Sequence, residues 1–159
     1  MKLAVPTAEG EFIAHYSEAG LAQLDFPGDE RTRRNDAQNP PQARKWHAAT
    51  TLALQEILAG KTPRSQPPLD LSCGTDFQRS VWQALLRIAA GQTKSYGEIA
   101  AEIGSPAATR AVGAACGANP IPVIIPCHRV LAAKMRLGGY SGAAGWKEKL
   151  LAVEGVLFV

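Results

Sequence analysis

Short apolar runs separated by turn residues mark the first part of the chain. Residues 12–16 and 21–26 both read as strands, and the glycines and the proline–glycine pair around them are typical of turns. The next stretch, 29–42, is polar, charged and contains proline, which predicts an exposed loop. The chain is therefore predicted to begin with strands and to continue into a surface loop.

Apolar residues take helical spacing after this loop. Residues 46–58 have the pattern of an amphipathic helix, which Gly60 ends. Residues 62–68 contain three prolines and are typical of a linker. We therefore place a domain boundary here, and we predict an N-terminal strand and helix domain over residues 1–68 and a second domain over residues 69–159.

The second domain is predicted to be mostly helical. Thr75 and Ser95 are each suited to cap a helix, the first ending at Gly91 and the second at Ile103. A Gly-Ser-Pro turn then leads into an alanine-rich helix over residues 107–117. Helix, tight turn, helix is the outline of a helix-turn-helix motif. The small side chains of the last helix suit close contact with a surface or groove, and they suit a tightly packed core equally well.

The last part of the chain combines a strand, a loop and a helix. Residues 123–125 form a β-branched run that predicts a short strand ending at Pro126, because proline cannot donate a backbone hydrogen bond. Residues 138–142 are rich in glycine and predict a loop of unusual conformational freedom. A final helix is predicted over residues 146–153, with Glu-Gly at 154–155 as its end.

Composition narrows the class of protein. With 46% hydrophobic residues, the 159-residue chain can bury a substantial core. It holds no stretch of about 18 apolar residues, so no transmembrane helix is expected. Residues 1–6 lack the apolar core and cleavage site of a secretory signal peptide. Three cysteines without a framework spacing indicate reduced thiols, and we therefore expect a cytoplasmic protein without membrane association.

Positive charge is concentrated in the second half of the chain. The whole chain carries a net charge of +3. Residues 72–159 hold nine Lys and Arg against five Asp and Glu, a net +4, whereas residues 1–71 hold eight against nine, a net −1. This surplus is compatible with a polyanionic partner on the second half, although ordinary solvated surfaces carry similar biases.

A thiol followed by an imidazole is the main candidate for chemistry. Cys127 and His128 follow the apolar run that ends at Pro126, and Arg129 comes next. A thiol is a nucleophile only as the thiolate, and a nearby histidine can take up its proton. A lone cysteine in an apolar run is most often an inert core residue, but this succession of residues favours a reactive site. Because neighbouring side chains on a strand point to opposite faces, direct contact requires a bent backbone or a bridging water.

Two other kinds of site fit these residues less well. A zinc site needs several Cys or His ligands at close spacing, whereas Cys116 and Cys127 lie eleven residues apart. The other histidines, His15 and His47, lie in the first segment, so no metal is expected. A cysteine hydrolase would need a histidine together with a residue such as Asn119, but no oxyanion motif is evident.

A long motif surrounds the candidate thiol. Residues 119–130, Asn-Pro-Ile-Pro-Val-Ile-Ile-Pro-Cys-His-Arg-Val, resemble the active-site segment of the O6-alkylguanine-DNA alkyltransferases. The resemblance continues upstream in residues 95–100 and 110–113, and downstream in residues 139–142 and 147–155. It covers more than half of the chain with ordered, specific motifs. The first segment matches the variable N-terminal domain of that family only in outline.

The resemblance implies catalytic roles for five residues. Cys127 would accept the alkyl group, and His128 would take the thiol proton through a water molecule. Glu154 would orient His128. Asn119 would hold the turn between the recognition helix and the active-site strand, and Tyr96 would donate a hydrogen bond to the flipped base.

The resemblance also implies a pocket for the damaged base. Ser141 would hydrogen-bond near the guanine O6, and Tyr140 would form a wall of the pocket. The backbone carbonyls of Cys127 and Val130 would read the exocyclic amine. Lys147 would support the pocket electrostatically. A guanine O6 inside a stacked base pair cannot be reached, so the nucleotide must leave the helix.

The remaining implied roles concern DNA. Arg110 would fill the gap that the flipped base leaves, and Thr109, Ala111 and Gly113 would contact DNA from the same helix. Pattern and resemblance together predict an α+β fold. It comprises a small N-terminal α/β domain followed by a mostly helical C-terminal domain with a winged-helix-like helix-turn-helix.

The implied activity is DNA repair. The alkyl group of O6-alkylguanine, and also of O4-alkylthymine, in double-stranded DNA would move irreversibly to Cys127 in a single turnover, without a cofactor and by a monomer. The alternatives are a non-enzymatic protein that binds alkyl lesions, an ordinary helix-turn-helix DNA reader and a cysteine hydrolase. Cys127 favours transfer over lesion binding, because lesion binders of this kind have another residue in place of the cysteine.

The chain departs from the family pattern at the expected lip of the pocket. Gly-Ala at 142–143 stands where the family often has a glycine pair, and Ala-Gly-Trp at 144–146 replaces branched or polar residues. The tolerated alkyl size therefore stays open. Some relatives bind zinc through N-terminal cysteines, but this chain has no cysteine before Cys73. We expect Cys73 and Cys116 to be spectators.

Overall fold

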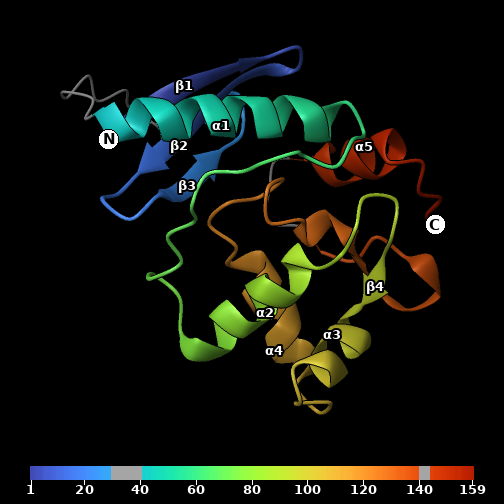
Figure 1. Ribbon diagram of the computed structural model, residues 1–159. Coiled ribbons are helices and arrows are strands. Elements are labelled where there is room, and N and C mark those ends of the chain that lie inside the picture. Colours follow the sequence, from blue (N-terminus) through green and yellow to red (C-terminus); the bar gives the residue numbers. More distant parts are fainter. Residues whose placement is uncertain (30–40, 140–143) are drawn as a thin grey trace.

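The structure, a computed structural model, describes residues 1–29, 41–139 and 144–159. It combines helices with two small sheets (Figure 1). The predicted mixture of α and β structure is therefore confirmed. None of the described helices is both long and apolar enough to cross a membrane.

Three antiparallel strands open the chain, in the order β1-β2-β3. They are β1 (Lys2–Thr7), β2 (Gly10–Tyr16) and β3 (Leu21–Asp25). Both predicted strands are confirmed, whereas β1 was not predicted. Pro6 lies in it, and proline is tolerated there because β1 is an edge strand.

Helix α1 (Pro41–Leu58) packs against β1 and β2 and covers the buried face of the sheet (Figure 1). It begins earlier than the predicted residue 46, so the expected loop over 29–42 is wrong at its end. Pro41 suits the first position of a helix, whose N–H needs no intrahelical partner. The linker then returns to the sheet, where the amide of Leu21 donates to the carbonyl of Pro68.

Three helices form the next layer. Helix α2 (Asp76–Leu86) begins with a capping box between Thr75 and Gln78, and it ends before the predicted Gly91. Helix α3 (Tyr96–Glu102) is capped by Ser95 as predicted.

Helix α4 (Thr109–Gly117) contacts both α2 and α3. It begins two residues after the predicted start. The amide of Ala108 donates to the carbonyl of Ser105, so Pro106 lies in a turn, where its fixed φ also fits. The indole of Trp82 in α2 donates to the carbonyl of Ala115 at 2.8 Å and ties these two helices together.

The predicted strand over residues 123–125 is wrong. Val123 has a φ of +74°, and the segment turns instead of pairing with a sheet. The Asn119 side chain takes part in this turn: its amide donates to Ile125 O at 2.8 Å, and its carbonyl accepts from Ile121 N at 3.0 Å. The β-branched residues reflect burial in the core here, and not strand pairing.

The remaining elements are short. They are β4 (Lys94–Ser95), which pairs in parallel with β5 (Val130–Leu131), the 3-10 turns η1 (Cys127–Arg129) and η2 (Ala133–Met135), and helix α5 (Trp146–Val153). One continuous hydrophobic core joins the first sheet, α1, α2, α3, α4 and the segment before η1. The domain boundary at residue 68 stays a prediction.

Candidate active site

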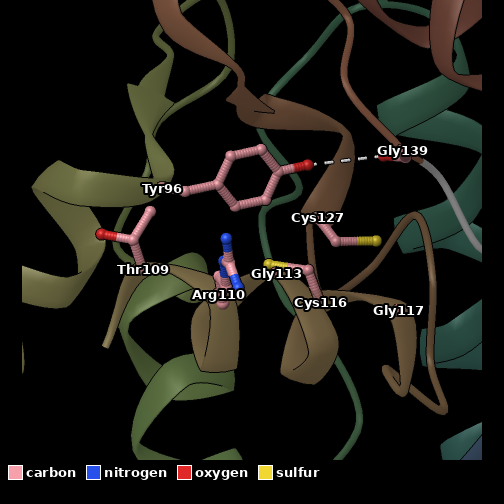
Figure 2. A pocket seen from close by; sticks show the side chains of 8 residues that line it. All are labelled: Tyr96, Thr109, Arg110, Gly113, Cys116, Gly117, Cys127 and Gly139. Atoms are coloured by element: carbon pink, nitrogen blue, oxygen red, sulfur yellow. Dashed lines mark hydrogen bonds between the residues drawn. The ribbon is translucent and has the colours of Figure 1, made fainter. Parts of the chain in front are cut away.

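A pocket of about 570 Å³ lies between α3, α4 and η1 (Figure 2). Cys127 lines it, and its side chain is only 3% exposed. The residues around the pocket are Tyr96, Thr109, Arg110, Gly113, Cys116, Gly117, Cys127 and Gly139. Five of these eight were predicted as site residues from the sequence.

The backbone bends sharply at the thiol. Cys127 opens the 3-10 turn η1, in which the amide of Arg129 donates to Pro126 O at 3.0 Å. The amide of Cys127 itself donates to Ile125 O at 2.8 Å. The backbone at Cys127 is therefore bent, which is one of the two routes, beside a bridging water, by which Cys127 and His128 can interact.

His128 is held by a buried carboxylate. Its Nε2 lies 2.9 Å from Oε1 of Glu154, the residue that ends α5, and the histidine is fully buried. Burial lowers the pKa of His128, although the hydrogen bond to Glu154 opposes this, so the ring is neutral at neutral pH. Because an ionised carboxylate only accepts hydrogen bonds, Nε2 carries the ring proton and Nδ1 is left as an acceptor. Nδ1 is buried without a partner among the described residues.

Arg129 completes the buried charge cluster. Its guanidinium donates to both oxygens of Glu154, at 2.7 to 3.1 Å, and to Ile88 O at 2.6 Å. Burial raises the pKa of Glu154, but the hydrogen bonds from His128 and Arg129 outweigh it and lower that pKa to about 2. Glu154 is therefore ionised wherever the protein is folded near neutral pH.

A second cation lies close to the thiol from another direction. Lys147 in α5 is 3% exposed, and its Nζ donates to Val130 O at 2.8 Å and to Gly139 O at 3.2 Å. Burial lowers the pKa of Lys147, while the proximity of Cys127 and Cys116 raises it. The ammonium thus connects two backbone carbonyls beside the reactive residue.

Tyr96, the first residue of α3, borders the pocket opposite α4 (Figure 2). Its hydroxyl donates to Gly139 O at 3.4 Å. Burial is the main reason that the pKa of Tyr96 is raised, and the nearby Cys116 and Cys127 raise it further. Gly138 has a φ of +65°, and a Cβ there would stand 3.1 Å from the tyrosine oxygen. Glycine is therefore required beside the ring.

Helix α4 supplies the other wall. Arg110, Gly113 and Gly117 follow one another at three- and four-residue spacing and therefore share one face. Thr109 and Arg110 are exposed to solvent at the start of this helix. Ala111 is also exposed but does not line the pocket. Tyr140 and Ser141, both predicted to contact the base, lie outside the described residues.

Residues 76–156 match the family described as 6-O-methylguanine DNA methyltransferase, DNA binding domain. The chain belongs to this family. The match begins at the first residue of α2 and includes every residue of the pocket. The resemblance inferred from the sequence motifs is thereby confirmed.

Individual members of the 6-O-methylguanine DNA methyltransferase family are similar to this chain over different lengths. A methylated-DNA–protein-cysteine methyltransferase of Mycobacterium bovis is 52% identical over 101 residues, which is 64% of this chain and 61% of that protein. A protein of the same name from Mycolicibacterium paratuberculosis is 45% identical, over 79% of this chain and 73% of its own. The crystal structure of Mycobacterium tuberculosis OGT in complex with DNA covers 96% of this chain and 90% of its own, at 38% identity and a TM-score of 0.77.

Two residues near the thiol were missed by sequence reasoning. Cys116, expected to be a spectator, lines the pocket of this 6-O-methylguanine DNA methyltransferase family member, and burial raises its pKa to about 12. Its position three residues after Gly113 was the available signal, because that spacing puts both on one helix face. Arg129 was noted only as an unusual neighbour of His128. Cys73 is exposed, away from the pocket.

The described residues contain no cluster of three or more His, Cys, Asp or Glu side chains that could hold a metal ion. The side chains gathered around Cys127 supply a neutral imidazole, a buried carboxylate and two buried cations beside the thiol.

Proposed function

We propose that this protein repairs alkylated DNA by moving the alkyl group from O6 of guanine, and from O4 of thymine, in double-stranded DNA to Cys127. One observation carries the proposal: the buried Cys127 lines a pocket that also reaches the exposed start of α4, where Arg110 lies. The names of the mycobacterial relatives, which refer to methylated DNA and to a protein cysteine, support this reading.

The proposed step is a single displacement. The Cys127 proton moves to Nδ1 of His128 through a water molecule, and the thiolate attacks the alkyl carbon. A carbon–sulfur bond forms as the carbon–O6 bond breaks, and the bonding electron pair stays on the guanine. The proton then goes to the guanine anion, so that hydrogen and alkyl group exchange places.

The buried cluster behind the thiol suits this proton transfer. Nδ1 of His128 is the acceptor because Nε2 is committed to Glu154. When His128 becomes cationic, the ionised Glu154 stabilises the imidazolium, and Arg129 keeps that carboxylate in place. The product is a thioether, which has no easy leaving group, so each protein molecule reacts once.

The pocket is proposed to hold a flipped base. Tyr96 donates a hydrogen bond to it, and Ser141 donates near O6, where negative charge grows in the transition state. The carbonyl of Val130 already accepts from Lys147, and its second lone pair accepts the exocyclic amine, together with Cys127 O. Tyr140 closes the pocket.

The DNA-reading part is proposed to be α3, the following turn and α4, with β4, β5 and the turn after them as a winged-helix-like extension. Helix α4 contacts DNA through Thr109, Ala111 and Gly113, and Arg110 enters the gap left by the flipped nucleotide. The proposal includes a DNA-reacting unit over residues 69–159 and an N-terminal unit over residues 1–68, which share one hydrophobic core. It also includes a monomeric state and a cytoplasmic location, where thiols stay reduced.

Intact-protein mass after incubation with duplex DNA containing O6-methylguanine tests the proposal. The expected result is a gain of one methylene per protein molecule, located on the Cys127 peptide, with one lesion removed for each protein modified. DNA with unmodified guanine is the control. Binding to the lesion without a mass change would instead identify a lesion binder and overturn the transfer proposal.

A further inference from the structure

The beginning of α5 is fixed by ring packing. Its N-cap is Gly145, which has a φ of +85° and supplies no capping side chain. The next residue, Trp146, lies against two phenylalanines of the N-terminal sheet region. Its ring centroid is 5.4 Å from that of Phe12 in β2, edge to face, and 5.1 Å from that of Phe26, just after β3. The two phenylalanine rings also contact each other.

A second contact ties the same turn to the sheet region. Lys149 lies over the Trp146 ring, with Nζ 5.0 Å from the ring centroid, and forms an ion pair with Glu9 between β1 and β2. Both links join the first turn of α5 to the sheet. No side chain caps this helix, so these contacts hold its first turn against the sheet, while the buried Leu150 and Leu151 hold the turn that follows.

Lys147 follows Trp146 directly in the chain, and its ammonium hydrogen-bonds to Gly139, which lines the pocket. Consecutive residues on a helix point about 100° apart, so the direction of the tryptophan ring sets the direction of the lysine. Lys147 Nζ reaches the carbonyls of Val130 and Gly139, and the Tyr96 hydroxyl donates to the same Gly139 carbonyl. The position of this ammonium therefore depends on where the tryptophan is seated.

We propose that Trp146 is a positioning residue: seated on Phe12 and Phe26, it holds Lys147 against the Val130 and Gly139 carbonyls and so keeps a cation beside Cys127. The N-terminal sheet thereby takes part in setting the reactivity of the thiol. The proposal goes beyond the proposed alkyl transfer, because it concerns the reactivity of Cys127 toward any electrophile.

Several charged or titratable groups face Lys147. From its own helix there is Glu148, and from other elements there are Cys127, Cys116 and His128. A nearby cation favours the thiolate, whereas displacing that cation favours the protonated thiol. Displacement of Lys147 is therefore expected to lower the nucleophilicity of Cys127 most at neutral pH and least at alkaline pH.

The test measures Cys127 carboxamidomethylation by iodoacetamide between pH 6 and pH 10, in the full chain with Cys73→Ser, which removes the exposed thiol. Adducts are located by peptide mass. Lys147→Met and Trp146→Ala are both expected to move the midpoint of the pH profile upward by about half a unit. That corresponds to a roughly threefold slower reaction at pH 7. The difference between the rates is expected to narrow as the pH rises, because more of the thiol is then ionised in every variant.

Three controls separate positioning from general loss of stability. Trp146→Phe keeps an aromatic ring and is expected to restore the wild-type profile. Leu54→Ala removes a buried side chain of α1 and is expected to destabilise the protein without moving the midpoint. In a double-mutant cycle, Trp146→Ala is expected to add no further shift once Lys147→Met is present, because both changes act through the same ammonium.

Additive midpoint shifts in the cycle, a shift in Leu54→Ala equal to that in Trp146→Ala, or an unchanged profile in a folded Trp146→Ala variant would each overturn the proposal. The readout does not use alkylated DNA. A normal iodoacetamide result without methyl uptake from O6-methylguanine therefore refutes the proposed function alone, whereas methyl uptake with a tryptophan-independent profile refutes only the positioning role.

Discussion

The Nε2 atom of His128 lies 2.9 Å from Oε1 of Glu154, and both side chains are sealed from solvent. This contact fixes the ring orientation and its tautomer, so the second nitrogen is available to accept a proton. An imidazole in this state can activate a neighbouring thiol without being charged beforehand.

Replacement of Cys127 should separate binding from reaction. Cys127→Ala is expected to abolish methyl transfer from duplex DNA and to leave affinity for the lesion largely intact, because the thiolate makes the bond while the rest of the pocket holds the base. Intact mass and gel-shift titration measure the two effects. Cys73→Ala is the matched control and should transfer normally, since Cys73 is exposed away from the pocket. Methyl removal by Cys127→Ala would mean that another residue is the acceptor.

Arg110→Ala should affect DNA more than a free base. The exposed arginine at the start of α4 is expected to stabilise the flipped state, which free O6-benzylguanine does not need. Repair of duplex DNA should slow at least roughly tenfold, the equivalent of about 1.4 kcal/mol, whereas the reaction with O6-benzylguanine should change little. Rapid-quench kinetics on both substrates measure the difference. Equal slowing on both would contradict this role.

Acid should remove the stabilisation that Glu154 provides. Its pKa falls from 4.5 to about 2 on folding, so the contribution is fully present above pH 4.5 and is lost as the pH falls toward 2. A pKa difference of this size corresponds to about 3 kcal/mol of free energy of unfolding. Glu154→Gln should lose about 3–5 kcal/mol at pH 7, because the buried Arg129 is left without its carboxylate, and should show a weaker pH dependence below pH 4.5. Urea unfolding across this range measures both, and parallel pH curves for the two proteins would exclude the assignment.

The alkylated protein should be less stable than the unmodified one. Cys127 is almost fully buried although it lines the pocket, and an added methyl that presses against the packed side of this residue costs roughly 1–3 kcal/mol. Methylation should therefore lower the melting temperature by several degrees, and a benzyl group should lower it further. Thermal melting of the three forms, each confirmed by mass, tests the effect. Unchanged melting would remove the strain argument, and more than one lesion repaired per molecule would contradict single use.

Local signals allowed the helices to be predicted. Thr75 with Gln78 and Ser95 form caps through hydrogen bonds within three residues, and such contacts can be read from spacing. The prediction of a strand over residues 123–125 was wrong because a run of β-branched residues indicates burial and not strand pairing. Here the side chain of Asn119 hydrogen-bonds to the backbone and favours a buried turn over a strand. That choice involves competing hydrogen bonds, which spacing does not reveal.

The features of the site likewise divide into those that the sequence indicated and those that it did not. The succession of Cys127 and His128 indicated a reactive thiol, but the partnership of His128 with Glu154 came only from the family resemblance. The seat of Trp146 on Phe12 joins opposite ends of the chain, and no periodicity encodes such a contact. The place of Cys116 in the pocket wall was not predicted, because an alanine-rich helix gives no sign of which face is covered by core and which by a pocket. Its role as a spectator stays a prediction.

The continuous core that joins the sheet to α2, α3 and α4 also limits how the molecule can open. Amide hydrogens in β2 and in α4 draw their protection from the same packed residues, so they would exchange with solvent through one shared opening event. A protease that cut the proline-containing linker would leave two fragments still held together by that core. Chain continuity and cooperative folding are therefore separate properties in this protein.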